Sequence, residues 1–124
     1  MTIYSMTIEE IADAIGNATG LEFISNGNPN YLTYTTWIKD GYGIRLTTSN
    51  SKTKKFGYKP QQTIYCTILE TKFNNPKDMQ IRIANNIKEA IKTIKRCNKI
   101  ITTATDIKAA LYTDFNNSVT TERR

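Results

Sequence analysis

The sequence contains no histidine, only two cysteines and no long hydrophobic run. The absence of histidine excludes a Ser-His-Asp or Cys-His relay, a histidine general base and histidine-ligated zinc within one chain. Two cysteines, Cys66 and Cys97, can form neither a disulfide framework nor a four-thiolate zinc site, so we interpret both as reduced core thiols. No segment approaches the ~20 apolar residues that cross a bilayer, and the first residues lack the basic and apolar regions of a signal peptide. We therefore expect a cytoplasmic protein that does not insert into a membrane.

Acidic residues are also scarce, since 11 Asp and Glu stand against 17 Lys and Arg and the formal net charge is +6. The carboxylates are not paired at spacings typical of acid/base catalysis, and no phosphate-loop, dinucleotide-binding or nucleophile-elbow motif is present. These absences favour a binding protein over an enzyme, and they imply no cofactor. Without repeats or linkers, the chain is expected to form a single domain over residues 1–124, with a frayed tail at 116–124.

Residue periodicity in the first part of the chain predicts one helix and a set of strands. A capping box at residues 7–10 precedes apolar residues at helical spacing, which predicts a short N-terminal helix ending near Gly16. Segments rich in β-branched and aromatic residues then predict an antiparallel meander of about four strands. These segments are residues 21–25, 31–39, 42–48 and 63–73. The Asp40-Gly41 pair predicts a type I′ hairpin turn, and the polar residues 49–62 are expected to form an excursion between strands.

The last third of the chain predicts one long and one shorter helix. Asn75 as N-cap and Pro76 in the first turn mark the expected start of the long helix. Its apolar stripe consists of Ile83, Ile87, Ala90, Ile91, Ile94, Cys97 and Ile101. A second capping signal at 103–106 precedes the apolar face of the shorter helix, which holds Ile107, Ala110, Leu111 and Phe115. The predicted fold class is therefore α+β.

Candidate ligand-binding residues lie around the expected start of the long helix and on its polar face. Phe73 and Asn74 precede free helix amides that can bind phosphate, and an aromatic ring can stack on a base. Arg82, Asn85 and Asn86 offer guanidinium and amide donors. Five cations lie opposite the apolar stripe: Lys88, Lys92, Lys95, Arg96 and Lys99. The structural alternatives are a core position for Phe73 and an ordinary solvated face for the cations.

Two further features allow both a structural and a functional interpretation. Trp37 shares a strand face with Tyr31 and Thr33, so it can fill the core or serve as a stacking platform, and the core is favoured. The basic, aromatic segment 52–59 can be an electrostatic arm for nucleic acid or a solvated loop, and the loop is favoured.

A meander followed by Phe73-Asn74-Asn75-Pro76 and an amphipathic helix bearing Asn85 and Asn86 resembles the phage-encoded Thoeris anti-defence sponge proteins. The resemblance implies a viral protein in the host cytoplasm that sequesters glycosidic cyclic ADP-ribose, the messenger of a TIR defence enzyme, without cleaving it. It also implies that this small anionic nucleotide lies between protomers of a homo-oligomer and contacts Phe73 and Asn85 or Asn86. Charge and geometry alone add three cations: Arg82, Lys92 and Arg96.

The competing hypothesis is a nucleic-acid-binding or protein-blocking inhibitor of another bacterial defence, such as an anti-CRISPR. In that case the basic helix face and the segment 52–59 would contact DNA, guide RNA or the RNA-binding groove of an effector, and the positive net charge would favour the encounter. Added salt separates the two hypotheses, because binding through many phosphates weakens steeply with salt. A small nucleotide hydrolase is the least favoured class, since it would have to work without histidine and without paired carboxylates.

Overall fold

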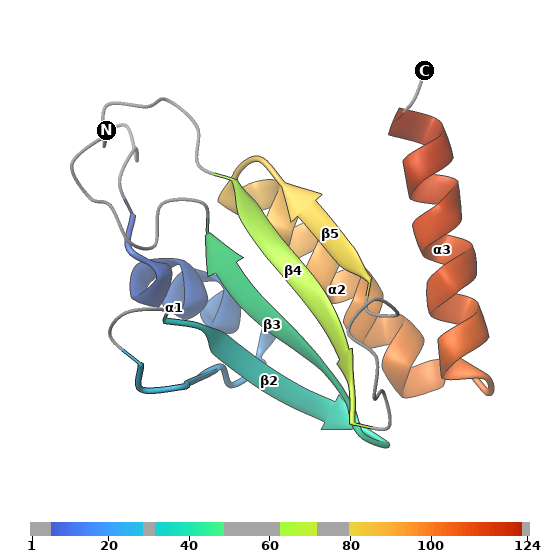
Figure 1. Cartoon of the computed structure of the whole chain (residues 1–124), viewed down its shortest axis with the longest axis horizontal. Coiled ribbons are helices and arrows are strands. Elements are labelled where there is room, and N and C mark those ends of the chain that lie inside the picture. Colours follow the sequence, from blue (N-terminus) through green and yellow to red (C-terminus); the bar gives the residue numbers. More distant parts are fainter. Residues whose placement is uncertain (1–5, 29–31, 49–62, 72–79, 123–124) are drawn as a thin grey trace.

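The computed structural model describes residues 6–28, 32–48, 63–71 and 80–122, and within them three helices flank a five-stranded antiparallel sheet (Figure 1). The strands are β1 (Ile24–Ser25), β2 (Tyr34–Lys39), β3 (Tyr42–Thr48), β4 (Ile64–Glu70) and β5 (Ile81–Ala84), paired in sequence order. The helices are α1 (Ile8–Thr19), α2 (Ile87–Thr103) and α3 (Ile107–Glu122). The α+β fold is confirmed, with a fifth strand added to the four expected. None of the helices in these ranges is long and apolar enough to cross a membrane.

Helix α1 begins as predicted and ends later than predicted. The Thr7 hydroxyl accepts a hydrogen bond from the Glu10 amide at 3.1 Å, and the Glu10 carboxylate accepts one from the Thr7 amide at 2.9 Å. Together they complete the capping box. The helix continues past Gly16 and ends at Gly20, whose φ of 80° suits glycine. Gly16 serves a close approach, since a Cβ there would lie 3.0 Å from the Leu21 carbonyl oxygen.

The turn between β2 and β3 is the predicted type I′ hairpin. Asp40 has a φ of 53° and Gly41 a φ of 82°, so both central residues adopt the left-handed conformation that this turn requires. The Gly41 carbonyl also accepts from the amide of Thr71 at 3.0 Å. The turn is thereby tied to the end of β4.

The hydrophobic core lies between one face of the sheet and the helices α1 and α2 (Figure 1). Successive strand residues alternate between the two faces of the sheet, so one residue in two faces the helices. The sheet contributes Ile44, Leu46, Ile64 and Cys66, and the helices contribute Ile11, Ile15, Ile94 and Ile101. Each of these side chains is at most 1% exposed. Among the described residues, no helix covers the opposite face of the sheet.

The prediction that Trp37 belongs to the core is wrong. Its side chain is 56% exposed on the sheet face that points away from the helices. The reason is its register: Trp37 pairs with Gly43, and the residues on either side, Thr36 and Ile38, face the helices instead. The stacking-platform interpretation of Trp37 stays a prediction.

The long helix starts eleven residues later than an N-cap at Asn75 would place it, because residues 81–84 form β5. Asn86 is the N-cap of α2 and accepts from the Glu89 amide at 2.9 Å. Ile83, expected in the helical stripe, lies on the strand and is 58% exposed. Four further residues of the stripe are buried on α2, namely Ala90, Ile94, Cys97 and Ile101, and Ile87 and Ile91 are partly buried against the core. The expected cap at Asn75 and Pro76 lies outside the described residues.

Helix α3 begins at the second predicted capping signal. The Asp106 carboxylate accepts from the Ala109 amide at 3.1 Å, and Ile107 and Leu111 are buried as expected. The helical backbone extends to Glu122, and so enters the segment 116–124 that the sequence assigned to a frayed tail.

Cys66 and Cys97 are free and buried, as predicted. Burial raises the pKa of Cys66 to about 12, with the neighbouring Cys97 adding to the effect and Arg82 opposing it. Burial likewise raises the pKa of Cys97 to about 11, against the opposing influence of Arg82. The thiols therefore stay protonated and unreactive near neutral pH.

The buried thiols predict a loss of stability at alkaline pH. Above the ordinary thiol pKa of 9.0 the unfolded chain releases protons that the folded chain keeps, so the free energy of unfolding falls as pH rises. The expected slope is up to about 1.4 kcal/mol per pH unit for each thiol between pH 9 and the folded pKa. Urea denaturation across this pH range measures it, and Cys97→Ala should flatten the dependence. An unchanged slope in that variant would contradict the assignment.

Candidate functional site

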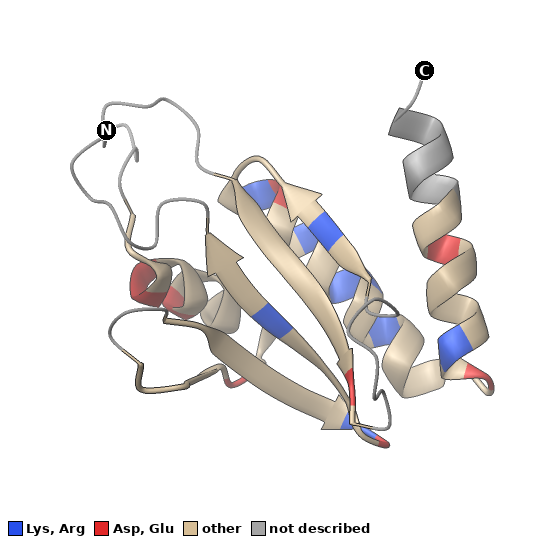
Figure 2. Cartoon of the chain, viewed as in Figure 1, with Lys and Arg blue, Asp and Glu red and all other residues tan. Residues whose placement is uncertain are grey.

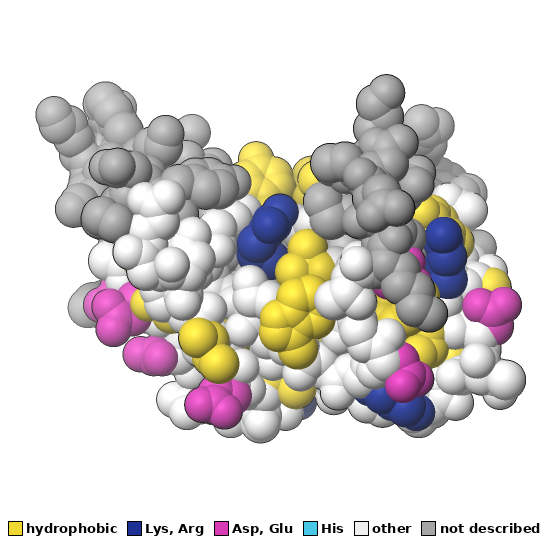
Figure 3. Space-filling view, turned by 60° about the horizontal axis from the view of Figure 1, so that its bottom comes forward, with side chains coloured by type: hydrophobic (Ala, Val, Ile, Leu, Met, Phe, Trp, Pro, Cys, Tyr) yellow, Lys and Arg dark blue, Asp and Glu magenta, His cyan; other side chains and the backbone are white. Residues whose placement is uncertain are grey.

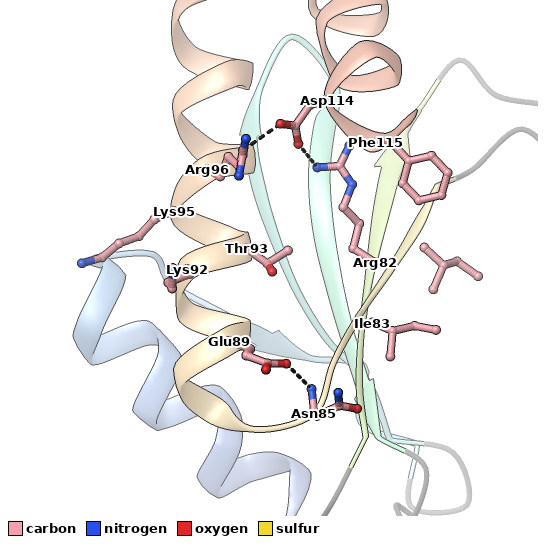
Figure 4. A pocket seen from close by; sticks show the side chains of 11 residues that line it. Arg82, Ile83, Asn85, Glu89, Lys92, Thr93, Lys95, Arg96, Asp114 and Phe115 are labelled. Carbon is pink, nitrogen blue, oxygen red and sulfur yellow. Dashed lines mark hydrogen bonds and ion pairs between the residues drawn. The ribbon is translucent and has the colours of Figure 1, made fainter. Parts of the chain in front are cut away.

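A groove of about 840 Å³ follows the free edge of β5, between that strand, α2 and α3 (Figure 4). Strand β5 pairs only with β4 in the described part of the chain, so its other edge faces the groove. Residues of α2 lie on one side of the strand, and Ile83 and Phe115 lie on the other. A ligand along this edge would therefore contact two different chemical surfaces.

The groove carries more positive than negative charge. Four cations line it, namely Arg82, Lys92, Lys95 and Arg96, against the two carboxylates of Glu89 and Asp114, a balance of 4 − 2 = +2. The basic positions of α2 follow the length of the helix (Figure 2). The groove therefore suits an anionic ligand.

Arg82 forms the inner wall and is 7% exposed. Its Nη1 donates to Asp114 Oδ2 at 2.8 Å and to Cys97 Sγ at 3.1 Å. Its Nη2 donates to Gln80 Oε1 at 2.6 Å and to the Leu111 carbonyl at 2.8 Å. These contacts connect β5, α2 and α3. Although Arg82 lines the groove as predicted, its terminal nitrogens are engaged within the protein.

Asp114 holds a second cation at the groove. Its Oδ1 accepts from Arg96 Nε at 2.7 Å, while its Oδ2 accepts from Arg82. Arg96 is 64% exposed, and its two terminal nitrogens make no hydrogen bond with the described residues. Asp114 thus fixes the direction of the Arg96 side chain and leaves two donors for a ligand.

The remaining charged groups differ in where they point (Figure 4). Lys92 is exposed and makes no ion pair with the described residues. The Lys95 ammonium extends away from β5. Glu89 accepts from the Asn85 amide at 2.9 Å, so its carboxylate is committed to the start of α2. Lys92 and Arg96 are therefore the two cations best placed for an anion.

The other side of the groove is apolar. Ile81 and Ile83 are 49% and 58% exposed on the edge strand. The ring of Phe115 lies on the same side of β5 as Ile83 (Figure 4), and its centroid is 5.4 Å from the guanidinium carbon of Arg82. This contact holds the ring at the rim of the groove through a cation–π interaction. A flat ring of a ligand could pack on this side.

The structure brings together four of the seven predicted site residues: Arg82, Asn85, Lys92 and Arg96 line the groove. Asn86 is a capping residue of α2 and does not line the groove. Phe73 and Asn74 lie outside the described residues. The sequence missed Phe115, which it placed on an apolar helix face, and Asp114. Phe115 and Asp114 reach the groove because α3 packs beside β5, and no local sequence pattern predicts that packing.

A second hollow, of about 400 Å³, lies near the hairpin turn. Asp40, Glu70 and Asp106 line it together with Lys108, so its charge does not suit an anionic ligand. The described residues contain no group of three or more Cys, Asp and Glu side chains placed to hold a metal ion. The groove along β5 is the better candidate for the predicted chemistry.

The sheet, the helices packed on one of its faces and the groove define a small two-layer α+β protein with a cationic surface site. No protein-family model, no curated protein and no solved structure matches the chain.

Proposed function

We propose that this protein binds a compact nucleotide of the cyclic ADP-ribose type and sequesters it without cleaving it. In this proposal it is a viral anti-defence protein that removes glycosidic cyclic ADP-ribose and so blocks TIR-based immune signalling. The observation that carries the proposal is the groove along β5, where cations on one side stand opposite an apolar, aromatic wall on the other. A nucleotide combines the two matching groups, phosphates and a flat base.

Each part of such a ligand has a matching set of side chains. Lys92 and the terminal nitrogens of Arg96 can bind the phosphates through charge-assisted hydrogen bonds. Ile83 and Phe115 offer an apolar surface to the adenine. The Asn85 side chain offers amide groups to the ribose hydroxyls. The groove thus offers complementary groups to each part of the proposed ligand.

The carboxylates of the groove favour binding over chemistry. Glu89 accepts a hydrogen bond from the Asn85 amide, and Asp114 forms ion pairs with both Arg82 and Arg96. Both carboxylates are therefore engaged by neighbouring groups of the protein. The proposal therefore assigns no catalytic residue.

The proposal includes a homo-oligomer in which a second protomer closes the groove. The apolar rim formed by Ile81 and Ile83 is about half exposed in the single chain. Tight capture at low ligand concentration favours burial at a subunit interface over an open surface. We therefore expect ligand to increase the fraction of dimer in sedimentation experiments.

Isothermal titration tests the proposal with cyclic ADP-ribose isomers, linear ADP-ribose, AMP and inorganic phosphate. We expect a cyclic isomer to bind most tightly, to raise the melting temperature and to survive moderate salt, because few phosphates are involved. Heating the complex should release unchanged ligand. Absence of binding at micromolar protein and ligand would refute the proposal, and recovery of a cleaved product would show an enzyme instead.

A further inference from the structure

The sheet face that points away from the helices carries an unusual concentration of exposed hydrophobic side chains. The large hydrophobic residues exposed in the described part of the chain are Ile24, Trp37, Ile81 and Ile83. Strand register and alternation place all four on this face. Figure 3 shows a hydrophobic group near the centre of the molecule with a basic group beside it, while the acidic groups lie away from it. An exposed hydrophobic surface of this kind is typical of an interaction site.

Trp37 is positioned on this face by a glycine on the neighbouring strand. A Cβ atom at Gly43 would lie 2.7 Å from Trp37 Cε3 and 3.1 Å from Cδ2, so the indole packs against the Gly43 backbone. The side chain is nevertheless 56% exposed. The indole is therefore held on one side and free on the other, which is the arrangement of a stacking platform.

Arg45 lies on β3 in the middle of the same face. It pairs with Thr35 on β2 and with Thr67 on β4, so polar but uncharged residues flank it. Its Nε is buried and makes no hydrogen bond with the described residues, and no described carboxylate forms an ion pair with it. The residues that β1 to β5 direct to this face include no Asp or Glu. In the described part of the chain, Arg45 is therefore a cation without an ion-pair partner, and the side chains on either side of it are neutral.

A second aromatic side chain lies on the other side of Arg45. Tyr65 on β4 pairs with Thr47, four residues along β3 from Gly43. From strand geometry, Trp37 and Tyr65 are about 13 Å apart along the strands and about 10 Å apart across them. The row that contains Arg45 lies between these two rings. This separation is too large for one base and suits an extended chain with repeated rings and phosphates.

We propose that this open sheet face binds single-stranded nucleic acid, with bases stacked on Trp37 and Tyr65 and a phosphate at Arg45. Aromatic residues on the open face of an antiparallel sheet are a common means of holding unpaired bases. A second copy of the chain fits less well, since this face offers no carboxylate to the Arg45 of a partner and each chain carries a net charge of +6. The site adjoins the groove proposed above, since Tyr65 pairs with Ile83 of β5. Its centre is different, because Trp37 lies three strands away from β5 and the groove cations Lys92 and Arg96 lie on α2.

Trp37 is the single tryptophan of the chain, so its fluorescence reports on this face directly. Titration with short oligo(dT) and oligo(rU) is expected to quench the fluorescence, and the two arms distinguish DNA from RNA. A single phosphate contact predicts a salt dependence of log affinity with a slope of about −0.7. Contact through the basic face of α2 would give a much steeper slope and no quenching.

Variants of the face complete the test with labelled oligonucleotides and fluorescence anisotropy. Trp37→Ala should weaken binding about tenfold or more, as expected for the loss of one stacked base. Arg45→Gln should weaken it and flatten the salt dependence. If Trp37→Ala fails to fold, as judged by its melting curve, Arg45→Gln decides alone. The matched control is Lys88→Ala/Lys99→Ala, which removes two cations of α2 that line neither surface.

Three results would overturn the inference. They are the absence of quenching by either oligonucleotide, full affinity in Arg45→Gln, and a concentration-dependent dimer that Trp37→Ala abolishes. The last result would assign the face to a second copy of the chain. Because the test uses no cyclic nucleotide and no groove variant, its failure leaves the proposed function of the groove unaffected.

Discussion

Replacing Arg82 by alanine is expected to lower the free energy of unfolding by about 3–5 kcal/mol, as measured by urea denaturation. The side chain is 7% exposed and donates hydrogen bonds to Asp114, Cys97, Gln80 and Leu111. Its loss would leave the largely buried Asp114 carboxylate with Arg96 as its remaining ion-pair partner among the described residues. It would also remove the connection between β5, α2 and α3.

A double-mutant cycle with Asp114→Ala separates the ion pair from the other contacts of Arg82. The two residues are 2.8 Å apart and share a buried environment, so their effects should not add. The pair between the exposed Arg96 and Asp114 provides the comparison, and Arg96→Ala should cost about 1 kcal/mol or less. A loss below about 1 kcal/mol in Arg82→Ala would contradict the structural role assigned to this residue.

Removing Lys92 and Arg96 together is expected to weaken nucleotide binding about 100-fold in isothermal titration. Each cation supplies charge-assisted contacts to phosphate, and loss of one is expected to cost about tenfold in affinity. The variant should remain folded, because both side chains are exposed and Asp114 keeps its pairing with Arg82.

The matched control for this variant is Lys88→Ala/Lys99→Ala. It removes the same amount of charge from the same helix, but neither residue lines the groove. The control should bind the nucleotide with nearly unchanged affinity at moderate salt, where long-range attraction is screened. Equal losses in the two variants would mean that net charge, rather than the groove, determines binding.

Those elements whose boundaries depend on local chemistry were predictable from the sequence. The capping box at Thr7 and Glu10 and the turn at Asp40 and Gly41 involve neighbouring residues only, and both are confirmed. Strand β5 was missed because Ile83 and Ile87 are four residues apart, a spacing that fits a helix. What makes residues 81–84 a strand is pairing with β4, and this long-range contact leaves no local signal.

The candidate site was predictable in part for the same reason. Arg82, Lys92 and Arg96 were selected on charge, and all three line the groove. The structural role of Arg82 could not be inferred, because it depends on Asp114 and Leu111, about thirty residues further along the chain. The exposure of Trp37 was equally unpredictable, since it depends on which face of the sheet the helices cover.

The most direct test of the central claim, that the groove along β5 holds the nucleotide, is the titration of backbone amide signals by NMR with a cyclic ADP-ribose isomer. The account predicts that the largest shifts occur at residues of β5, the first half of α2 and the Phe115 region of α3, while the Trp37 indole signal stays unchanged. Shifts confined to the open sheet face, or to the acidic hollow near Asp40, would contradict it.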